Sequence, residues 1–582
     1  MGQQKHDLTP AQYDAVKDDT KRLRILAGAG SGKTRVLTHR IAHQSRALRI
    51  EPEHVLCLTF TKKAAEELSG RLRTLGLSNP VTAGTFHALA YAQLKTRWKD
   101  LGLSRTPSIL ENRKAILGSI LPKQLAFDTR ESIVNEINWA TSRRLTPETY
   151  SAAAESTRRN LPNGTSQISE FMRLFSQEKK KRNLLDFDDI LENAISDLAK
   201  DTEYAAGRHW KYRYIFVDEF QDVNPLQFAL LRAWLGPDSS ICVVGDPNQA
   251  IYSWNGADAK YLENFATYFP GSRTIELTEN FRSTPEIIKS ASSLLKKKVE
   301  LNAQKPSGEI PSLHQAKTCS DEAEYIARSI LENRRYNEGW ARQAVLVRTH
   351  AQISQIADTL SRFSIPCSVP SSRETSPETK NSHIESDSVT IATFHAAKGL
   401  EWPIVYIAGL EEGFSPISYA MSDAALDEER RLLFVAMTRA QDELHCSWAR
   451  ERAFGNRKVN RKPSPYLKEI SHSVRSSNLP ISGGPSLRDR IQNLRGQLFP
   501  KVRPKEKSTE RKNLENWRNS QALAADVKPG DVISDEAIEQ LISRKPSTTD
   551  QLEKLTHLNS FKIARYGDDL IRILSNENGT KA

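Results

Sequence analysis

The sequence predicts an α/β protein with two lobes built on parallel sheets, followed by an all-helical region. Three observations lead to this prediction. Short apolar runs alternate with helical stretches in two successive sets, which is typical of parallel strands covered by helices on both faces. A long stretch without such runs interrupts the first set. Helical periodicity returns near the C-terminal end, after a polar and basic segment.

Apolar runs mark the expected strands of the two sheets. The first sheet is predicted from Leu23–Leu26, Val55–Thr59, Tyr214–Val217 and Ser240–Val244. The second sheet is predicted from Thr274–Leu277, Ala344–Val347, Val389–Thr393, Ile404–Ile407 and Glu443–Ser447. Because ligands of such sheets bind beside the carboxyl ends of the strands, the site is expected there, in a cleft between the lobes.

A glycine-rich turn follows the first apolar run and precedes Lys33 and Thr34. Its residues are Ala27, Gly28, Ala29, Gly30, Ser31 and Gly32. The N–H groups of such a turn and of the following helix bind phosphate, so Lys33 is expected to reach the β- and γ-phosphates of ATP and Thr34 to hold Mg²⁺. An ordinary strand-to-helix turn is the alternative, since Ala27 stands where the strict pattern has glycine.

A pair of carboxylates, Asp218 and Glu219, follows the apolar run Tyr214–Val217. Asp218 is expected to hold Mg²⁺ through water, and Glu219 to orient and deprotonate the attacking water. Two acids that merely end a strand in solvent are the alternative. That alternative is disfavoured because Phe220–Asp222 follows, and because a further strand ends shortly afterwards at Asp246. Together with the glycine-rich turn, this pair predicts an enzyme that hydrolyses ATP.

Composition narrows the class of protein. The formal net charge is +12, which favours a polyanionic partner, and 38% of the residues are hydrophobic, enough for several cores. No apolar run approaches the ~20 residues of a membrane span, and the polar N-terminus lacks the apolar core of a signal peptide. The five cysteines show no C-x-x-C pairing. We therefore expect a cytoplasmic protein without a membrane partner, a disulfide framework or a zinc site.

The order of these motifs resembles the UvrD/Rep/PcrA type of superfamily 1A DNA helicase over residues 1 to 470. The matching segments are Leu8–Gln12, Ala27–Thr34, Leu58–Ala65, Gly84–His87, Val217–Asp222, Val244–Asp246, Gln249–Trp254, Glu279–Ser283, Thr393–Glu401, Glu428–Leu432 and Val435–Ala440. The resemblance implies two RecA-like lobes. It also implies an enzyme that hydrolyses ATP with Mg²⁺, translocates 3′ to 5′ on single-stranded DNA and unwinds duplex in DNA repair or replication.

The resemblance assigns four residues to the base and sugar of ATP. The Gln12 amide carries a donor and an acceptor and would pair with the adenine edge. Arg35 and Phe281 would sandwich the adenine, and Glu401 would hold the ribose. The family usually has tyrosine at the position of Phe281, so stacking is expected without a phenolic hydrogen bond.

Three further residues would act on the phosphates, again by resemblance. Gln249 would sense the γ-phosphate. Arg282 and Arg439, carried on the second lobe, resemble two arginine fingers, which accelerate phosphoryl transfer by stabilising charge. A surface salt bridge is the alternative for either arginine considered alone. If both are fingers, hydrolysis would require the cleft to close.

The resemblance also assigns aromatic and polar residues to the DNA side of the site. They are Phe60, Thr61, Thr85, His87, Phe187, Tyr252, Trp254 and His395. Base stacking is worth ~1 to 3 kcal/mol per base and depends little on sequence, which suits an enzyme that steps along any strand. Asn255 follows Trp254 where the family normally has arginine, so the coupling between stacking and the nucleotide cleft is open to question.

The resemblance also divides the chain into domains. Lobe 1A is expected over residues 1–88 and 185–271, and a helical domain 1B over 89–184. Lobe 2A is expected over 272–470, with a short loop at 368–387 in place of a folded domain 2B. The basic run Lys179–Arg182 in domain 1B is either a phosphate contact or a solvated helix face.

The C-terminal tail contains a basic linker and a helical module. The linker is expected over residues 471–511, and an HRDC-like domain, with Ser534 as a helix N-cap, over 512–577. The HRDC-like domain would bind nucleic acid or protein, with a passive helical cap as the alternative. Expected partners are therefore single-stranded and tailed or forked DNA, with a repair or nuclease protein as a further option.

A second function remains open from the sequence. The chain would then be a DNA-stimulated translocase that remodels protein–DNA complexes or serves a partner nuclease. A helicase–nuclease fusion is disfavoured because the tail shows no clustered acid-and-lysine signature.

Overall fold

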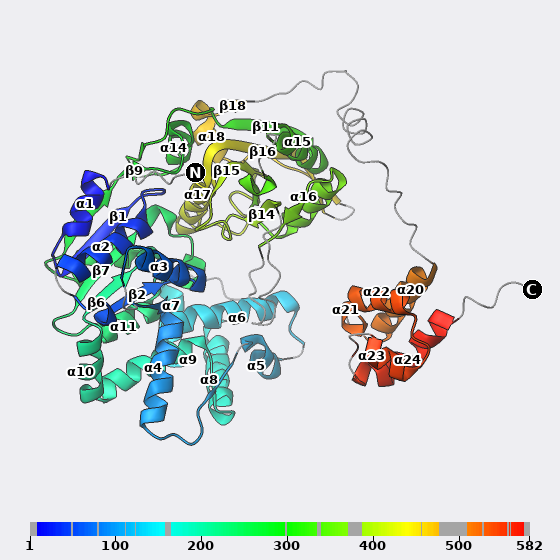
Figure 1. Cartoon of the computed structure of the whole chain (residues 1–582), viewed down its shortest axis with the longest axis horizontal. Coiled ribbons are helices and arrows are strands. Elements are labelled where there is room, and N and C mark those ends of the chain that lie inside the picture. Colours follow the sequence, from blue (N-terminus) through cyan, green and yellow to red (C-terminus); the bar gives the residue numbers. More distant parts are fainter. Residues whose placement is uncertain are drawn as a thin grey trace, which may run out of the picture. The chain divides into compact units, whose positions relative to one another are not determined.

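The computed structural model describes residues 8–47, 50–77, 81–110, 112–122, 124–157, 164–296, 300–334, 339–370, 387–454, 457–476, 509–525, 529–555, 558 and 560–575. The chain forms two compact units, residues 1–478 and 479–582. The first unit contains two parallel sheets, and the second is helical (Figure 1). The predicted fold class is therefore confirmed. No helix among the described residues combines the length and the apolarity needed to cross a membrane.

The first sheet has six parallel strands in the order β3-β2-β6-β7-β1-β8. Their bounds are β1 (Arg22–Ala27), β2 (Val55–Thr59), β3 (Thr82–Thr85), β6 (Tyr214–Val217), β7 (Ser240–Gly245) and β8 (Arg273–Leu277). The central strands read as nearly continuous apolar runs because helices cover both faces of the sheet. Every residue of β2 is buried.

The run Thr274–Leu277 was expected in the second lobe, and this expectation was wrong. β8 extends the first sheet by pairing with β1, with Ile275 opposite Ile25. Its residues alternate between exposed and buried, as expected at a sheet edge. An apolar run predicts a strand, whereas the choice of its partner depends on the path of the chain between strands.

Helices cover both faces of the first sheet. One face packs against α1 (Pro10–Lys17), α2 (Lys33–Ala47) and α3 (Lys62–Thr74). The other packs against α4 (Phe86–Asp100), α9 (Phe187–Lys200) and α11 (Pro225–Trp234), with α10 (Thr202–Lys211) beside α9. Alternate strand residues point to the two faces, so Ile215 and Val217 join the second of these cores while Phe216 joins the first.

A helical insertion lies between α4 and α9. Its elements are α5 (Arg113–Ile120), α6 (Phe127–Ser142), α7 (Pro147–Ser156) and α8 (Thr165–Lys181), with the short pair β4 (Ser108–Ile109) and β5 (Leu184–Leu185). The insertion has its own core, which includes Ile133, Tyr150 and Phe171. Residue 89, where domain 1B was expected to begin, falls inside α4, so this helix carries the chain from the sheet into the insertion.

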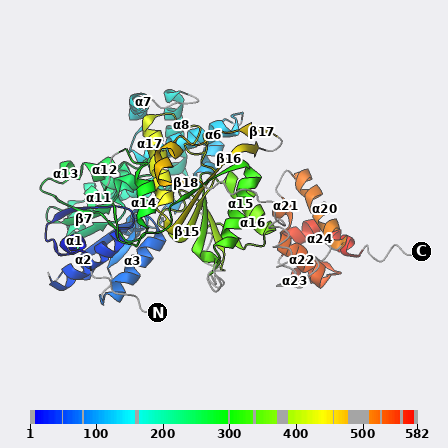
Figure 2. The same cartoon turned by 90° about the horizontal axis from the view of Figure 1, so that it is seen from above.

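The second sheet has the strand order β13-β14-β12-β15-β16-β11-β18, with β17 paired antiparallel to β16. The bounds are β11 (Ser312–Thr318), β12 (Gln343–Val347), β13 (Cys367–Ser368), β14 (Val389–Thr393), β15 (Trp402–Ile407), β16 (Ala440–Phe454), β17 (Arg457–Asn460) and β18 (Arg475–Ser476). Helices α14 (Pro285–Ser292) and α17 (Asp423–Met437) lie on one side of this sheet, and α15 (Cys319–Glu332) and α16 (Ala351–Arg362) on the other (Figure 2).

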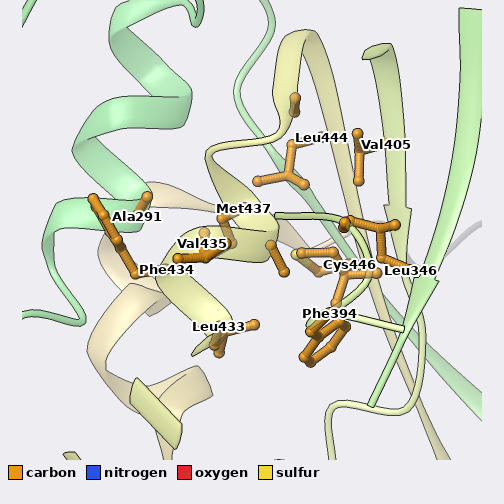
Figure 3. Close-up of a cluster of buried hydrophobic side chains, with 14 of the residues drawn as sticks. Ala291, Leu346, Phe394, Val405, Leu433, Phe434, Val435, Met437, Leu444 and Cys446 are labelled. Atoms are coloured by element: carbon orange, nitrogen blue, oxygen red, sulfur yellow. The ribbon is translucent and has the colours of Figure 1, made fainter. Parts of the chain in front are cut away.

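Helix α17 is the centre of the core on its side of the second sheet. Figure 3 shows Phe434 of α17 beside Ala291 of α14, whereas Leu444 and Cys446 of β16 lie across from Met437. The helix is therefore buried on two sides. This packing fixes the position of its C-terminal end, where Thr438 and Arg439 follow.

The segment expected to replace domain 2B joins β13 to β14. Residues 371–386 of this segment lie outside the described residues, as do 477–508 of the predicted basic linker. A small parallel pair, β9 (Glu279–Asn280) with β10 (Asn302–Ala303), lies at the start of the second lobe, and α18 (Tyr466–Ile470) lies near its end.

The second unit is a helical module. Its helices are α20 (Thr509–Ala525), α21 (Pro529–Val532), α22 (Asp535–Arg544), α23 (Thr549–Leu555) and α24 (Ser560–Ser575). Leu514, Leu541 and Leu570 are fully buried in its core. The predicted N-cap is confirmed, because the Ser534 hydroxyl accepts the N–H of Ala537 at 3.1 Å. Residues 526–528, 556–557, 559 and 576–577 of the predicted HRDC-like segment lie outside the described part.

A buried ion network holds the second lobe together. Arg452 of β16 pairs with Glu411 and with Glu322 of α15, and all three side chains are buried. Glu322 also accepts the N–H of Gly409 at 2.9 Å, and Glu411 accepts the N–H of Ala449 at 3.0 Å. The two carboxylates therefore depend on one guanidinium for compensation of their charge.

We predict that Arg452→Ala lowers the stability of this lobe by ~3 to 5 kcal/mol, because it leaves two buried carboxylates without a cation. The measurement is the shift of the denaturant midpoint followed by tryptophan fluorescence. The matched control is Arg328→Ala, which removes an exposed pair with Glu324 on α15 and is expected to cost under ~1 kcal/mol. Equal shifts for the two variants would contradict the prediction.

Candidate nucleotide and DNA site

The predicted site residues meet at one edge of the first sheet. The glycine-rich turn follows β1, Asp218 follows β6, and Asp246 follows β7. These three strands are neighbours in the sheet. Because all strands are parallel, their carboxyl ends share one edge, as expected for a ligand site of such a fold.

Two glycines of the turn have backbone conformations that other residues rarely adopt. Gly30 has φ +68° and Gly32 has φ +79°. A Cβ at Gly30 would also lie 2.5 Å from Nδ2 of Asn280. Glycine is therefore required at position 30 both by conformation and by space.

The Asn280 side chain links the glycine-rich turn to the start of the second lobe by hydrogen bonds. Its side chain is fully buried, and Nδ2 donates to the carbonyl of Ala29 at 2.6 Å. Oδ1 accepts the N–H groups of Arg282 at 3.0 Å and Ser283 at 2.8 Å. The amide thus links the phosphate-binding turn to the segment that carries the first arginine.

The residues expected to bind Mg²⁺ and phosphate lie together. Nζ of Lys33 donates to the carbonyl of Ala27 at 3.3 Å. The Thr34 hydroxyl donates to Oδ2 of Asp218 at 3.2 Å. Hydroxyl and carboxylate oxygens are the ligands that Mg²⁺ prefers, so this pair fits the ion.

Glu219 is held in a strained and charged position. Its φ of +51° is unusual for a residue other than glycine. Its N–H donates to Oδ1 of Asp218 at 2.9 Å, and its carboxylate accepts Nε2 of Gln221 at 2.5 Å. Burial would raise its pKa, but Lys33 and Lys398 outweigh burial and lower the pKa to about 2. Glu219 is therefore ionised and able to accept a hydrogen bond.

The second lobe reaches the same edge through Lys398. Its Nζ lies 2.5 Å from Oδ2 of Asp222 and 2.8 Å from the carbonyl of Gln249, both in the first lobe. Nε2 of Gln249 itself donates to Asp246 at 2.7 Å. Gln249 thus contacts the Asp246 carboxylate through its side chain, and a second-lobe cation binds its backbone carbonyl.

Both groups of the Gln12 amide contact the protein. Nε2 donates to the carbonyl of Ser31 at 2.9 Å, and Oε1 accepts the N–H of Thr9 at 3.2 Å. Nε2 retains a second N–H for a ligand. Phe281 is half-buried, and its N–H donates to the carbonyl of Gly30 at 3.0 Å. Arg35, in the first turn of α2, is also half-buried.

Arg282 and Glu401, expected to bind phosphate and ribose, contact each other. Nε of Arg282 lies 2.5 Å from Oε2 of Glu401. The other carboxylate oxygen of Glu401 accepts Nε2 of Gln441 at 3.0 Å. This pair is partly exposed, so a ligand could replace it at a modest cost.

Arg439 is a buried and incompletely hydrogen-bonded charge of the site. Its side chain is buried, Nε donates to Val435 at 2.9 Å and Nη1 to Leu400 at 3.2 Å. Nη2 is buried and has no hydrogen-bond partner among the described residues. Burial and, to a lesser extent, the neighbouring Arg282 lower the pKa of Arg439 to about 9, although the Glu219 carboxylate acts against this shift. The geometry therefore suits an anion placed between the two arginines.

An aromatic cluster lies beside the nucleotide residues. The ring of His395, from the second lobe, lies 6.3 Å from each of the rings of Tyr252 and Trp254. Trp254 is 65% exposed. Burial, together with the nearby cations Arg348 and Lys398, lowers the pKa of His395 to about 4. The histidine is therefore neutral and suited to contact bases.

Four more of the expected DNA residues lie at the same sheet edge or near it. Phe60 packs against the buried Phe86 with ring centres 6.0 Å apart. The hydroxyls of Thr61 and Thr85 cap α3 and α4, and each keeps its own O–H for donation. The eighth residue, Phe187, is 50% exposed and meets the ring of His87 edge-on at 5.7 Å.

A buried ion network holds the turn that carries Phe187. Nζ of Lys179 lies 2.5 Å from Asp186 and 2.6 Å from Asp189. Arg113 also contacts Asp186, at 2.9 Å. Lys179 is therefore neither a phosphate contact nor a solvated residue, the two options that the sequence left open for this basic run.

Sequence reasoning gave no role to Asn280 or Lys398. Both lie within motifs that it identified, directly beside assigned residues. The available signal for a role of these two residues was that each is a polar residue within a recognised motif and had no assigned function. Their partners, Ala29 and Asp222, lie far away in the chain.

Comparison with known proteins agrees with this geometry. Residues 8–270 match the UvrD/REP helicase N-terminal domain, residues 275–375 and 372–451 the UvrD-like helicase C-terminal domain, and residues 511–574 the HRDC domain. The first two matches together cover most of the chain.

Several curated relatives match nearly the whole chain. The ATP-dependent DNA helicase UvrD2 of Mycobacterium tuberculosis H37Rv is 28% identical over 686 residues, covering 97% of this chain and 98% of that protein. The ATP-dependent DNA helicase PcrA of Staphylococcus aureus NCTC 8325 is 25% identical, covering 80% and 86%. A solved C-terminal domain of a possible DNA helicase from Lactobacillus plantarum gives 17% identity, 34% coverage of this chain and 98% of that one, and a TM-score of 0.25, too low to add to the argument. From the family matches, the chain belongs to the UvrD/REP family of superfamily 1 helicases and carries an HRDC domain.

Proposed function

We propose that the chain, an ATP-dependent DNA helicase of the UvrD/REP family, translocates 3′ to 5′ on single-stranded DNA. It unwinds tailed or forked duplexes in DNA repair or replication. The observation that carries this proposal is the buried Nη2 of Arg439 on the second lobe, which has no hydrogen-bond partner among the described residues and whose charge interacts with the Glu219 carboxylate of the first lobe. A γ-phosphate between the lobes would complete its hydrogen bonding, so ATP would draw the lobes together.

The chemistry follows from the residues on the two sides of the cleft. Lys33 and the N–H groups of the glycine-rich turn bind the phosphates, and Glu219 orients and deprotonates the attacking water. Thr34 and Asp218 would hold Mg²⁺, which supplies charge stabilisation at the phosphates. Arg282 and Arg439 stabilise the charge that develops on the transferred phosphoryl group.

The remaining assignments concern adenosine and the γ-phosphate. Gln12 selects adenine with its remaining N–H, and Arg35 and Phe281 sandwich the base. Glu401 releases Arg282 and takes the ribose. Gln249 senses the γ-phosphate from the end of β7. These roles are supported by the position of each residue around the turn.

The DNA strand would pass along the aromatic residues at the same edge. Tyr252, Trp254 and Phe187 would stack on bases, and Phe60, His87 and His395 would line their pockets. Thr61 and Thr85 would donate to phosphates. The partial exposure of these rings supports the path, since a purely structural aromatic cluster would be buried.

This helicase would work without a folded domain 2B. Only about twenty residues separate β13 from β14, too few to bury a core. The C-terminal family model matches in two segments that meet here, and the alignment with the UvrD2 relative is longer than this chain. Contact with duplex DNA would then fall to domain 1B, the linker or the HRDC domain.

The test of the proposed function is strand displacement on duplexes with a 3′ tail, a 5′ tail or an RNA tail. The proposal predicts displacement from the 3′ DNA tail only. Displacement from the 5′ tail would overturn the polarity. DNA-stimulated ATPase without displacement would favour the second candidate, a translocase that remodels protein–DNA complexes or serves a nuclease, which the missing domain 2B supports.

Glu219→Gln is expected to bind ATP with unchanged affinity and to lose turnover by ~10²-fold or more, because the amide cannot accept the proton of the attacking water. Lys33→Ala is expected to lose both turnover and phosphate affinity. A fluorescent-nucleotide titration and a steady-state ATPase assay check both. Wild-type turnover by Glu219→Gln would show that another group is the base.

Arg282→Ala and Arg439→Ala are each expected to reduce DNA-stimulated turnover by ~10³-fold, because a finger acts on the transition state. Nucleotide affinity should change little. The double variant should be hardly slower than either single variant, since both act through one closed cleft. A loss confined to affinity, with the maximal rate kept, would argue against the finger role.

Removal of residues 479–582 is expected to leave ATPase stimulated by single strands intact and to weaken binding to forks. The cut follows β18, which pairs with β11 and belongs to the second sheet. Loss of phosphate contacts should flatten the salt dependence of fork binding. Titrations of both proteins across several salt concentrations measure this. Identical slopes and fork affinities would make the tail a cap or a protein-docking site.

A further inference from the structure

Hydrogen bonds join the loop that carries Trp254 to helix α17 of the second lobe. The N–H of Ser253 donates to Oε1 of Glu428 at 2.9 Å, and the Ser253 hydroxyl donates to the other oxygen of the same carboxylate. One turn further along α17, Nε of Arg431 donates to the carbonyl of Ala250 at 2.9 Å. Side chains of α17 thus form hydrogen bonds with the backbone at both ends of the segment 250–253.

The same loop is also packed against the helical insertion. Gly256 has φ +91°, and a Cβ there would lie 2.2 Å from the hydroxyl oxygen of Ser142 in α6. The short turn Ser253–Asn255 therefore lies where the insertion and both lobes meet. A change in the position of α17 relative to the first lobe must either move this turn or break its bonds to Glu428.

Helix α17 is connected directly to the catalytic side of the cleft. Its C-terminal end is followed by Arg439, whose Nε donates to the carbonyl of Val435 in the helix. Its hydrophobic core packing makes it a rigid element. The middle of this helix thus contacts the loop that carries Trp254, and its C-terminal end leads directly to Arg439.

We propose that Glu428 couples base stacking on Trp254 to the position of the second lobe, as a positioning residue of DNA-stimulated ATP hydrolysis. This inference rests on the proposed function. The contact between this loop and α17 is made by the two hydrogen bonds from Ser253 to the Glu428 carboxylate. DNA on Trp254 fixes the loop, the loop fixes Glu428, and α17 then holds Arg439 in place for hydrolysis.

The test compares ATP turnover with and without saturating single-stranded DNA in four proteins: wild type, Glu428→Ala, Ser253→Ala and the double variant. Glu428→Ala is expected to lower the stimulation by DNA about tenfold, because two exposed hydrogen bonds of modest net value are lost. Ser253→Ala keeps its N–H and should lose less. The double variant should match Glu428→Ala, because both changes break one contact.

Two further variants separate coupling from general damage. Glu428→Gln keeps an acceptor for the Ser253 N–H and is expected to restore part of the stimulation. Asp427→Asn is the matched control, since Asp427 is the neighbour of Glu428 on α17 but pairs with Lys296 within the second lobe, at 2.6 Å. It should be stimulated like wild type.

Each outcome identifies which claim fails. Absence of stimulation in the wild type would refute the proposed function itself. A stimulated wild type with equal stimulation in Glu428→Ala would refute the coupling role. Additive losses in the double variant would show that Glu428 and Ser253 act independently, and equal losses in Asp427→Asn would show that charge on α17 acts generally; either result would also refute the coupling role.

Discussion

A buried ammonium group, that of Lys398, joins the two lobes beside the catalytic carboxylates. A buried cation is costly unless it is paired and hydrogen-bonded. Its partners, the carboxylate of Asp222 and the carbonyl of Gln249, both belong to the opposite lobe. Burial alone would lower the pKa of Lys398, but Asp222 and Glu219 outweigh burial and raise it. The lobes therefore cannot separate here without leaving a carboxylate or the ammonium unpaired.

This contact places nucleotide and DNA residues along one continuous segment. From the end of β7 the chain passes Asp246, Gln249 and Tyr252 before it reaches Trp254. The Lys398 ammonium lies 5.1 Å from the ring centre of Tyr252 and also bonds to Gln249. A phosphate-sensing group and the stacking rings thus share one support, so a shift of the second lobe acts on both together.

The sequence allowed prediction of those features that local chemistry determines. Buried strands such as β2 appear as apolar runs, and Gly30 and Gly32 mark a turn that only glycine tolerates. The sheet to which β8 belongs was mispredicted, because an apolar run carries no information about its partner. The role of Lys179 was missed because a run of lysines normally marks a solvated helix face. Its partners, Asp186 and Asp189, lie beyond the turn that ends this helix. Asn280 and Lys398 act through residues far away in the chain, which periodicity and motif spacing do not reveal.

The most direct test of an active site completed by the second lobe is the Lys398→Met variant. Methionine keeps the length of the side chain and removes the charge that joins the lobes. The account predicts that the variant binds a fluorescent ATP analogue with near wild-type affinity, since the glycine-rich turn is intact, and that its DNA-stimulated ATP turnover falls by ~10²-fold or more. Turnover at the wild-type rate would contradict the account, because hydrolysis would then not require the lobes to be joined at this contact.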